Sequence, residues 1–360
     1  MAIEENKPRL VAPEPQAGDQ AAGAGLLRPR TLAEFVGQDE LKRRLRIFLD
    51  AALQRGDPLD HVLLSGPAGL GKTTLAHIVA KEMGATLHIT SGPAIQRSGD
   101  LASIVSNIQK RDVLFIDEIH RISRPAEEVL YTAMEDFRLD IVMGKGPAAR
   151  TLRLPLPPFT LIGATTRTGL LTNPLRDRFG ITANLEFYSE DELVHIVARG
   201  GDLLGLKLDA EGTREIARRS RGTPRVALRV LRNVRDVAQV RNQGLVTRQV
   251  AREALDLLQI DELGLDPMDR RMMDLLVVRY REFPVGLETL AVTLGEQPDT
   301  IAEVIEPFLI KVGFLARTPR GRVATPQAFV YFGQPPAPAP APAAGTQPHL
   351  DFNGKQEEEE

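Results

Sequence analysis

One segment constrains the fold of this chain more than any other. Residues 66–73 read GPAGLGKT, the full G-x-x-x-x-G-K-[ST] pattern of a phosphate-binding loop. A short apolar run at residues 60–65 precedes it, and a helical pattern at 72–83 follows it. Glycines in this setting let the backbone curl, so that successive N–H groups and the helix N-terminus face the phosphates. The segment therefore predicts a nucleotide site at a strand-to-helix turn.

The residue types in this loop indicate how the nucleotide is held. We expect Lys72 to neutralise the β and γ oxygens of ATP, and the Thr73 hydroxyl to ligate Mg²⁺. The expected contacts with ATP or ADP from this loop are Gly66, Gly69, Gly71, Lys72, Thr73 and Thr74.

Strand and helix patterns alternate through the first half of the chain, which is typical of a parallel sheet covered by helices. Further strands are expected at residues 85–90, 112–116 and 159–164, with helices at 100–110, capped by Asp100, and at 125–137. From Ser189 the pattern is helical, and Ser189 with Glu192 forms a capping box. Helices are expected at 210–219, 224–241 and 247–257.

A third unit follows the helical one. Helices at 267–281, 287–294 and 299–312 precede the hairpin-like FLARTPRGRVAT, which is the pattern of a winged helix. Its basic stripe, at 311–333, contains four cations and no acid. We divide the chain into tails at 1–25 and 334–360, which we expect to be disordered, an ATPase domain at 26–184, a helical domain at 185–257 and a winged helix at 258–333.

Composition excludes several classes of protein. With 42% hydrophobic and 26% charged residues the chain can bury a core. It has no cysteine, and its 6 histidines include no His-x-x-x-His pair, so thiolate catalysis and Cys-ligated metal sites are excluded. Apolar runs are too short for a membrane span, and a cytoplasmic protein is the default.

Two acids end the expected strand at 112–116. Asp117 and Glu118 follow an apolar run, and burying carboxylates there is costly unless something needs them. Such a pair is often only a helix cap. After a complete phosphate loop, however, we expect Asp117 to hold Mg²⁺ and Glu118 to polarise the attacking water.

Three later motifs are less decisive. Thr165 and Thr166 follow the next strand, where ligands bind in open α/β sheets, although a plain turn is an alternative. Arg178 in LRDRFG could reach a neighbouring subunit's nucleotide, and a solvated surface arginine is as good an interpretation. Arg225 in GTPR lies in the first turn of a helix, where a cation opposes the dipole, so a functional role is plausible.

Residues 139–154 do not fit a plain sheet. Two strand-like arms flank a Gly-Pro loop, and one arm offers Ile141, Val142 and Met143. We expect a protruding hairpin that binds a partner protein or DNA, with an ordinary edge hairpin as the alternative.

Together these motifs resemble the AAA+ family of ATPases, and within it the motors that migrate Holliday junctions. The resemblance covers residues 26–333, through LRPRTLAEFVGQ, GPAGLGKTTLA, LFIDEIHR, GATTR, LRDRFGI, RGTPRVALRVLRNVRD and RTPRGRVAT. It implies an α/β P-loop domain with a parallel sheet, a helical lid and a C-terminal winged helix on double-stranded DNA. It also implies a homo-hexameric ring and the partners RuvA, gripped by the hairpin, and RuvC.

The resemblance also assigns roles to single residues. It implies Thr166 as sensor 1, Arg178 as arginine finger and Arg225 as sensor 2, with Tyr188 near the adenine. Further implied nucleotide contacts are Leu27, Arg28, Glu135, Asp136 and Phe137, and the implied DNA contacts are Arg317 and Arg322.

The sequence is thus interpreted as an ATP-driven DNA translocase acting at four-way junctions. A clamp loader or protein remodeller of the same family is one alternative, and a nucleotide-switched DNA-binding protein without hydrolysis is another. Glu118 and Arg178 argue against the switch, since it would need neither a positioned water nor a finger.

Overall fold

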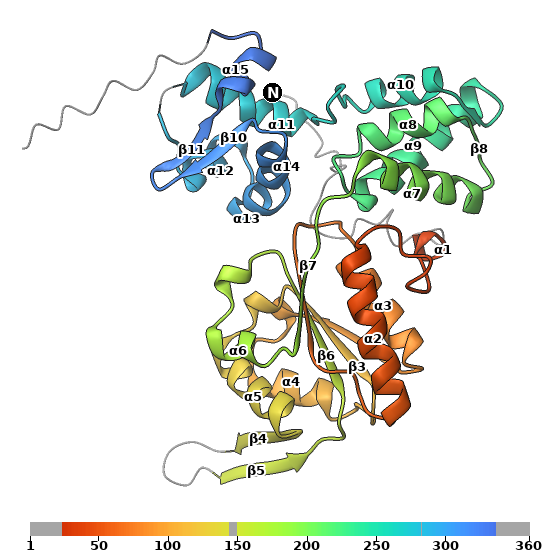
Figure 1. Cartoon of the computed structure of the whole chain (residues 1–360). Coiled ribbons are helices and arrows are strands. Elements are labelled where there is room, and N and C mark those ends of the chain that lie inside the picture. Colours follow the sequence, from red (N-terminus) through yellow and green to blue (C-terminus); the bar gives the residue numbers. More distant parts are fainter. Residues whose placement is uncertain (1–23, 144–149, 282, 336–360) are drawn as a thin grey trace, which may run out of the picture.

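The protein is described by a computed structural model that covers residues 24–143, 150–281 and 283–335. Three units follow one another along the chain (Figure 1). The α/β unit carries the helical lid and the winged helix at one end, and these two lie side by side above it. The expectations for both tails and for the loop of the hairpin lie outside the described residues, except at the inner edges of the tails.

A 5-stranded parallel sheet forms the centre of the α/β unit, in the order β2-β3-β6-β1-β7. Its strands are β1 (Val62–Ser65), β2 (Leu87–Ser91), β3 (Val113–Asp117), β6 (Thr160–Thr165) and β7 (Ile181–Asn184). The first four match the expected strands, and β7 is one that the sequence pattern missed. In β7 only alternate residues are buried, so this four-residue edge strand gives a weak signal.

Helices cover both faces of this sheet. The covering helices are α2 (Asp39–Arg55), α3 (Lys72–Glu82), α4 (Ser98–Val105), α5 (Arg124–Glu135) and α6 (Asn173–Asp177), while the short α1 (Ala24–Leu27) contacts the lid. Apolar residues of α2 and α3 pack on one face, and those of α4, α5 and α6 pack on the other. Every residue of β1 and β6 is buried between the two layers, so these strands form a rigid base for the loops at their carboxyl ends.

The predicted cap of α4 was wrong. The helix begins at Ser98, so Asp100 lies inside its first turn. There its carboxylate accepts the backbone N–H of Arg97 at 2.8 Å and that of Gln96 at 3.1 Å. An acid at either place satisfies free N–H groups, so composition alone could not distinguish a cap from a first-turn position.

The expected hairpin is present. Strands β4 (Arg138–Met143) and β5 (Arg150–Pro155) pair antiparallel, with Ile141 opposite Leu152. They form a separate two-stranded sheet that projects from the end of the α/β unit opposite to the lid (Figure 1).

The lid consists of α7 (Glu190–Leu203), α8 (Ala210–Arg218), α9 (Pro224–Arg241) and α10 (Arg248–Leu257), with the short strands β8 (Lys207–Leu208) and β9 (Leu245–Val246). The predicted capping box of α7 is confirmed, since Glu192 accepts the N–H of Ser189 and donates its own N–H to the Ser189 hydroxyl. Lid residues such as Val197 share one continuous core with Leu32 and Phe35 of the α/β unit.

The third unit is a winged helix with its own core. Its elements are α11 (Pro267–Asp274), α12 (Leu287–Leu294), α13 (Pro298–Thr300), α14 (Glu306–Lys311), β10 (Leu315–Thr318), β11 (Gly321–Ala324) and α15 (Pro326–Tyr331). Two helices expected to be regular contain π-helical turns, Leu275–Arg279 and Ile301–Ile305. In the second, Pro307 has no N–H for the carbonyl of Glu303, and its ring would clash with that carbonyl in a regular helix.

No helix among the described residues is long and apolar enough to cross a membrane.

Candidate nucleotide site

The phosphate loop connects β1 to α3 and takes a backbone path that glycine favours. Gly66, Gly69 and Gly71 have φ of 129°, 83° and 104°, a region that side chains disfavour. Gly71 is also the N-cap of α3, so the helix N-terminus opens directly onto the loop. A Cβ on Gly66 would lie 2.5 Å from the carbonyl oxygen of Leu185.

Lys72 is the buried cation of this loop. Its Nζ donates to the carbonyls of Gly66 at 2.7 Å and Pro67 at 2.9 Å. Burial lowers the pKa of Lys72 to about 8, and the nearby Asp117 carboxylate opposes that shift. The ammonium is therefore held against the phosphate loop by two of the loop's own carbonyls.

The two predicted acids lie where β3 ends. Asp117 is its last residue and accepts the N–H of Glu118 at 3.0 Å. Glu118 has φ 48°, a left-handed conformation that costs a non-glycine residue about 1 kcal/mol or more. Arg121 pairs with its carboxylate at 3.0 Å. Strain of this kind persists where the surroundings fix it, and it is common at functional sites.

The threonine pair lies at the carboxyl end of β6, next to β1. Thr165 is opposite Ser65 in the register, and its carbonyl accepts the N–H of Gly66 at 3.2 Å. Its hydroxyl contacts Nδ1 of His120 at 2.9 Å. Burial and the charge of Arg167 lower the pKa of His120 to about 4, so the ring is neutral at pH 7. His120 thus ties the turn after β3 to the end of β6.

The phosphate loop and the ends of β3 and β6 border one cavity of about 690 Å³. Predicted residues that line it are Leu27, Arg28, Gly69, Gly71, Lys72, Thr73, Thr74, Asp117, Glu118, Thr166, Tyr188 and Arg225. They come from the N-terminal segment, the phosphate loop, two strand ends and the lid, so the fold brings together most of what the sequence singled out. Gly66 is not in the lining and acts through the turn that it permits.

Two lid contacts fix the phosphate loop. The Tyr188 hydroxyl donates to the carbonyl of Leu70 at 3.2 Å, and burial raises the pKa of that tyrosine above its usual value. The backbone N–H of Arg225 donates to the carbonyl of Gly69 at 3.3 Å. A movement of the lid would therefore displace the phosphate loop directly.

Comparisons with known proteins place the chain in a family. Three family models match it in succession: the Holliday junction DNA helicase RuvB P-loop domain at residues 27–185, the RuvB AAA lid domain at 188–261 and the RuvB C-terminal winged helix domain at 262–333. The chain belongs to the RuvB family. As a member it is an AAA+ P-loop ATPase, which confirms the resemblance and the fold class predicted from the sequence.

Individual RuvB proteins are similar over most of the chain. A Holliday junction branch migration complex subunit RuvB from Thermobifida fusca is 56% identical over 336 residues, 93% of this chain and 95% of its own. One from a Nocardioides species is 61% identical over 316 residues, 88% of each chain. The solved Thermotoga maritima RuvB Holliday junction branch migration motor has 45% identity and a TM-score of 0.80, over 86% of this chain and 99% of its own.

Four predicted residues lie away from the cavity that holds the phosphate loop. Arg178, just after α6, donates to the carbonyl of Pro174 at 2.6 Å and pairs with Glu135 at 2.8 Å. Asp136 is the C-cap of α5, and Phe137 packs edge-on against Phe159. None of the predicted Glu135, Asp136, Phe137 and Arg178 lines that cavity in the described chain.

The sequence patterns did not point to two further residues, one beside Arg178 and one at the cavity. The ring of Tyr131 lies under the guanidinium of Arg178, 4.4 Å from its Cζ. Tyr131 and Glu135 are four residues apart on one helix, a spacing that could have flagged a shared face. Glu303 of the winged helix also lines the cavity, and its Oε2 accepts the Thr166 hydroxyl at 2.9 Å. No local pattern marks Glu303, because a glutamate in a helix is ordinary.

The wing arginines are engaged within their own unit. Arg317 and Arg322 lie opposite each other on β10 and β11, and both pair with the fully buried Glu306 at 2.6 Å. The Arg317 side chain is still 50% exposed, whereas that of Arg322 is 19% exposed. Arg320, at the exposed turn between the strands, has no ion pair within the described residues.

For the hairpin the structure describes the backbone alone at the predicted contact residues. Ile141, Val142 and Met143 form the outer half of β4, paired with residues 150–152 of β5.

Proposed function

We propose that this protein is the ATP-driven motor that migrates Holliday junctions along double-stranded DNA. The observation that carries the proposal is the single cavity onto which the phosphate loop, Asp117, Glu118 and Thr166 converge, in a chain that also bears a winged helix. Its relatives are named as RuvB subunits of branch migration complexes. A clamp loader or remodeller is not favoured, since all three units match the RuvB family.

The nucleotide would be bound by groups from three segments. Lys72 and the N–H groups of the phosphate loop neutralise and cradle the phosphates, while Arg225 approaches them from the lid. Leu27, Arg28 and Tyr188 form the part of the cavity suited to the base and ribose. The same residues would take ADP after hydrolysis.

Mg²⁺ fits the residues present. Thr73 and Asp117 line the same cavity and would hold the ion. No cluster of three His, Asp or Glu residues suited to a metal exists among the described residues, and P-loop enzymes need none, since substrate phosphates complete the shell. The bound ion would neutralise charge on the phosphate oxygens.

Hydrolysis would require a base, a sensor and a cation from a neighbouring subunit. Glu118 takes the proton of the attacking water, and the Thr166 hydroxyl donates a hydrogen bond to the terminal phosphate. Arg178 lies on another surface, so we assign it to the nucleotide of an adjacent subunit in a homo-hexameric ring, together with the neighbouring Glu135, Asp136 and Phe137.

Partners and DNA would bind at the two outer ends of the molecule. The wing arginines Arg317 and Arg322 would contact DNA phosphates, which position a protein without reading sequence. Residues Ile141 to Met143 on the projecting hairpin would bind RuvA, and the assembly would pass junctions to RuvC. A cytoplasmic location is part of the proposal, because the proposed substrate is DNA and a chain without cysteine suits a reducing compartment.

Migration of a synthetic four-way junction tests this proposal. We expect junction movement that needs ATP and RuvA, and that disappears in Lys72→Ala, which cannot neutralise the phosphates. ATPase activity without movement, with RuvA present, would leave the nucleotide site intact and refute the motor.

Two substitutions separate the roles within the site. Glu118→Gln should bind ATP normally but not turn it over, since the amide cannot accept the water proton. Mixed rings of Glu118→Gln and Arg178→Ala subunits should regain some activity, because some interfaces then pair an intact Glu118 with an intact Arg178. Mixtures no more active than either variant alone would place the finger in its own subunit.

A further inference from the structure

The winged helix reaches into the ATP site through a glutamate. Glu303 lies between Thr166 and Arg167, accepting the Thr166 hydroxyl at 2.9 Å on Oε2 and pairing with Arg167 at 3.0 Å on Oε1. Arg167 also pairs with Asp299, one helical turn earlier in the same unit, at 2.8 Å. The turn after β6 is thus held by two carboxylates from a unit more than 100 residues later in the chain.

The hydroxyl of Thr166 has a single proton to donate. In this structure that proton is committed to Glu303. A sensor threonine must donate the same proton to the terminal phosphate of ATP, so the two acceptors exclude each other. ADP lacks that phosphate and makes no such demand.

The negative charge of Glu303 strengthens its competition with the terminal phosphate. Its side chain is only 8% exposed and faces the cavity that contains Lys72 and Glu118. Burial raises the pKa of Glu303, and the Thr166 hydrogen bond opposes that shift. An added anion beside this carboxylate would repel it in a medium of low dielectric constant, while neutral or distant groups would not.

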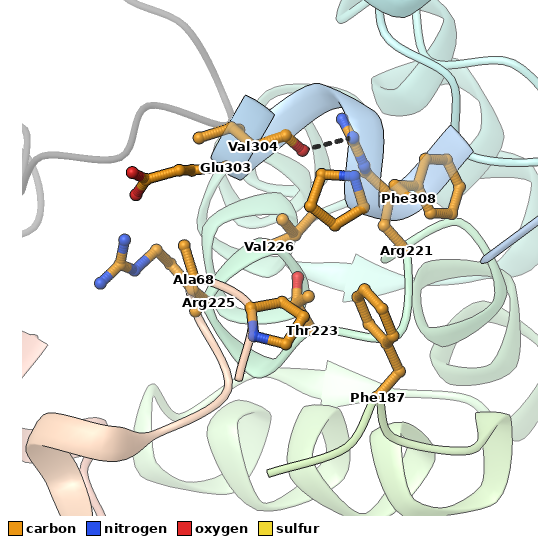
Figure 2. Close-up of a pocket in the computed structure, with 12 residues that line it drawn as sticks. Ala68, Phe187, Arg221, Thr223, Arg225, Val226, Glu303, Val304 and Phe308 are labelled. Atoms are coloured by element: carbon orange, nitrogen blue, oxygen red, sulfur yellow. Dashed lines mark hydrogen bonds between the residues drawn. The ribbon is translucent and has the colours of Figure 1, made fainter. Parts of the chain in front are cut away.

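The lid holds the segment of the winged helix that carries Glu303. Glu303 belongs to the π-helical turn Ile301–Ile305, and the next carbonyl, that of Val304, accepts Arg221 of the lid at 3.3 Å. Figure 2 shows this bond, with Glu303 and the Arg225 guanidinium pointing away from Phe308 on the same side. Arg221 stacks over the Phe308 ring at 4.4 Å, which ties α14 to the lid.

We propose that Glu303 competes with the terminal phosphate of ATP for Thr166, so that it weakens binding of ATP relative to ADP and lets ATP release the winged helix. This rests on the proposed function, in which Thr166 is the sensor. It supplies what that function needs: a direct contact through which the state of the nucleotide reaches the DNA-binding unit.

The test compares two nucleotides on the full-length chain. Calorimetric titration with Mg²⁺ and either ADP or a non-hydrolysable ATP analogue gives both affinities for wild type and for Glu303→Gln. The amide keeps the shape and removes the charge, so the analogue should bind about fivefold tighter or more, with ADP unchanged. Equal affinities for the analogue in both proteins, or equal shifts for both nucleotides, would overturn the proposal.

A double-mutant cycle tests whether the effect of Glu303→Gln depends on Thr166. In Thr166→Val the contested proton is absent, so adding Glu303→Gln should change analogue binding by less than the effect in wild type. If Thr166→Val leaves the preference between the two nucleotides unaltered, the sensor assignment fails; if it alters that preference while Glu303→Gln does nothing, this inference alone fails. Glu288→Gln, exposed on α12, is the matched control and should leave both affinities unchanged.

Release of the winged helix can be measured directly. Because the chain has no cysteine, Ile47→Cys on α2 and Val292→Cys on α12 give two exposed sites for spin labels, which are 62% and 82% exposed in wild type. With labelled subunits diluted in unlabelled ones, the analogue should shift the distance distribution and ADP should not. An unchanged distribution with the analogue bound would show that the contact persists, against the proposal.

Discussion

The guanidinium of Arg178 lies 4.4 Å over the ring of Tyr131 and donates to Glu135 at 2.8 Å. Both partners belong to α5, and the Tyr131 hydroxyl is itself anchored to Glu127 at 2.7 Å. The arginine proposed to act on a neighbouring subunit therefore does not hang freely from its loop. It has an aromatic platform on one side and a carboxylate at its end.

Removing the platform should slow turnover without weakening nucleotide binding. Tyr131→Leu is expected to lower kcat for ATP by about tenfold or more, because a displaced finger stabilises the transferring phosphoryl group less well. Tyr131→Phe keeps the ring and should retain most of the activity. Steady-state kinetics with separate binding titrations check this, and a rise in KM with unchanged kcat would count against a positioning role.

The lowered pKa of Lys72 predicts how ATP affinity changes with pH. Phosphates stabilise the charged ammonium, so affinity should hold below pH 8 and fall as pH rises through about 8, by up to about tenfold per unit. Titrations from pH 7.5 to 9.5 measure this, above the range where ATP itself takes up protons. Lys72→Arg stays charged throughout and should give a flatter profile, and equal profiles would contradict the assignment.

Arg221 should be required for stability. Its guanidinium is buried and pairs with Asp269 at 2.9 Å and Asp266 at 3.5 Å, and the Asp269 side chain is 0% exposed. Arg221→Leu would strip both acids of that partner, which typically costs about 3–5 kcal/mol. Calorimetric melting should show a clearly lower Tm. Arg235, paired with its neighbour Asp236 at the surface, is the control, and Arg235→Leu should change stability by less than about 1 kcal/mol.

The wing should separate DNA binding from folding. Arg320→Ala is expected to weaken binding to duplexes of any sequence and to lower the slope of log affinity against log salt by about 1. Arg317→Ala and Arg322→Ala would also take a partner from the buried Glu306 and so lower Tm. If the salt slope changed in none of Arg317→Ala, Arg320→Ala and Arg322→Ala, the DNA would have to bind elsewhere on the protein.

Local patterns predicted the parts of this protein that local chemistry determines. The phosphate loop, the acids after β3 and the capping box at Ser189 depend on residues within a few positions of one another, so the sequence alone shows them. Most of the proposed nucleotide contacts then meet because parallel strands end at the same edge of the sheet. Their individual roles stay predictions.

What the sequence could not show depends on contacts between distant segments. Glu303 reaches Thr166 from a π-helical turn whose next carbonyl accepts Arg221, and no periodicity in the sequence encodes that arrangement. The same holds for Arg317 and Arg322, whose charges meet Glu306 inside the unit. From the sequence alone, arginines in a basic stripe are interpreted as free cations, and only the fold shows that a buried acid pairs with them.

The contact between Gly66 and Leu185 has a mechanical consequence. The first glycine of the phosphate loop touches the carbonyl at which the chain leaves β7 for the lid, with no room for a methyl group between them. The phosphate loop is therefore packed directly against the segment that connects β7 to the lid. A larger residue at position 66 should therefore distort both the phosphate loop and the connection to the lid. Nucleotide binding and any movement of the lid would then be impaired together.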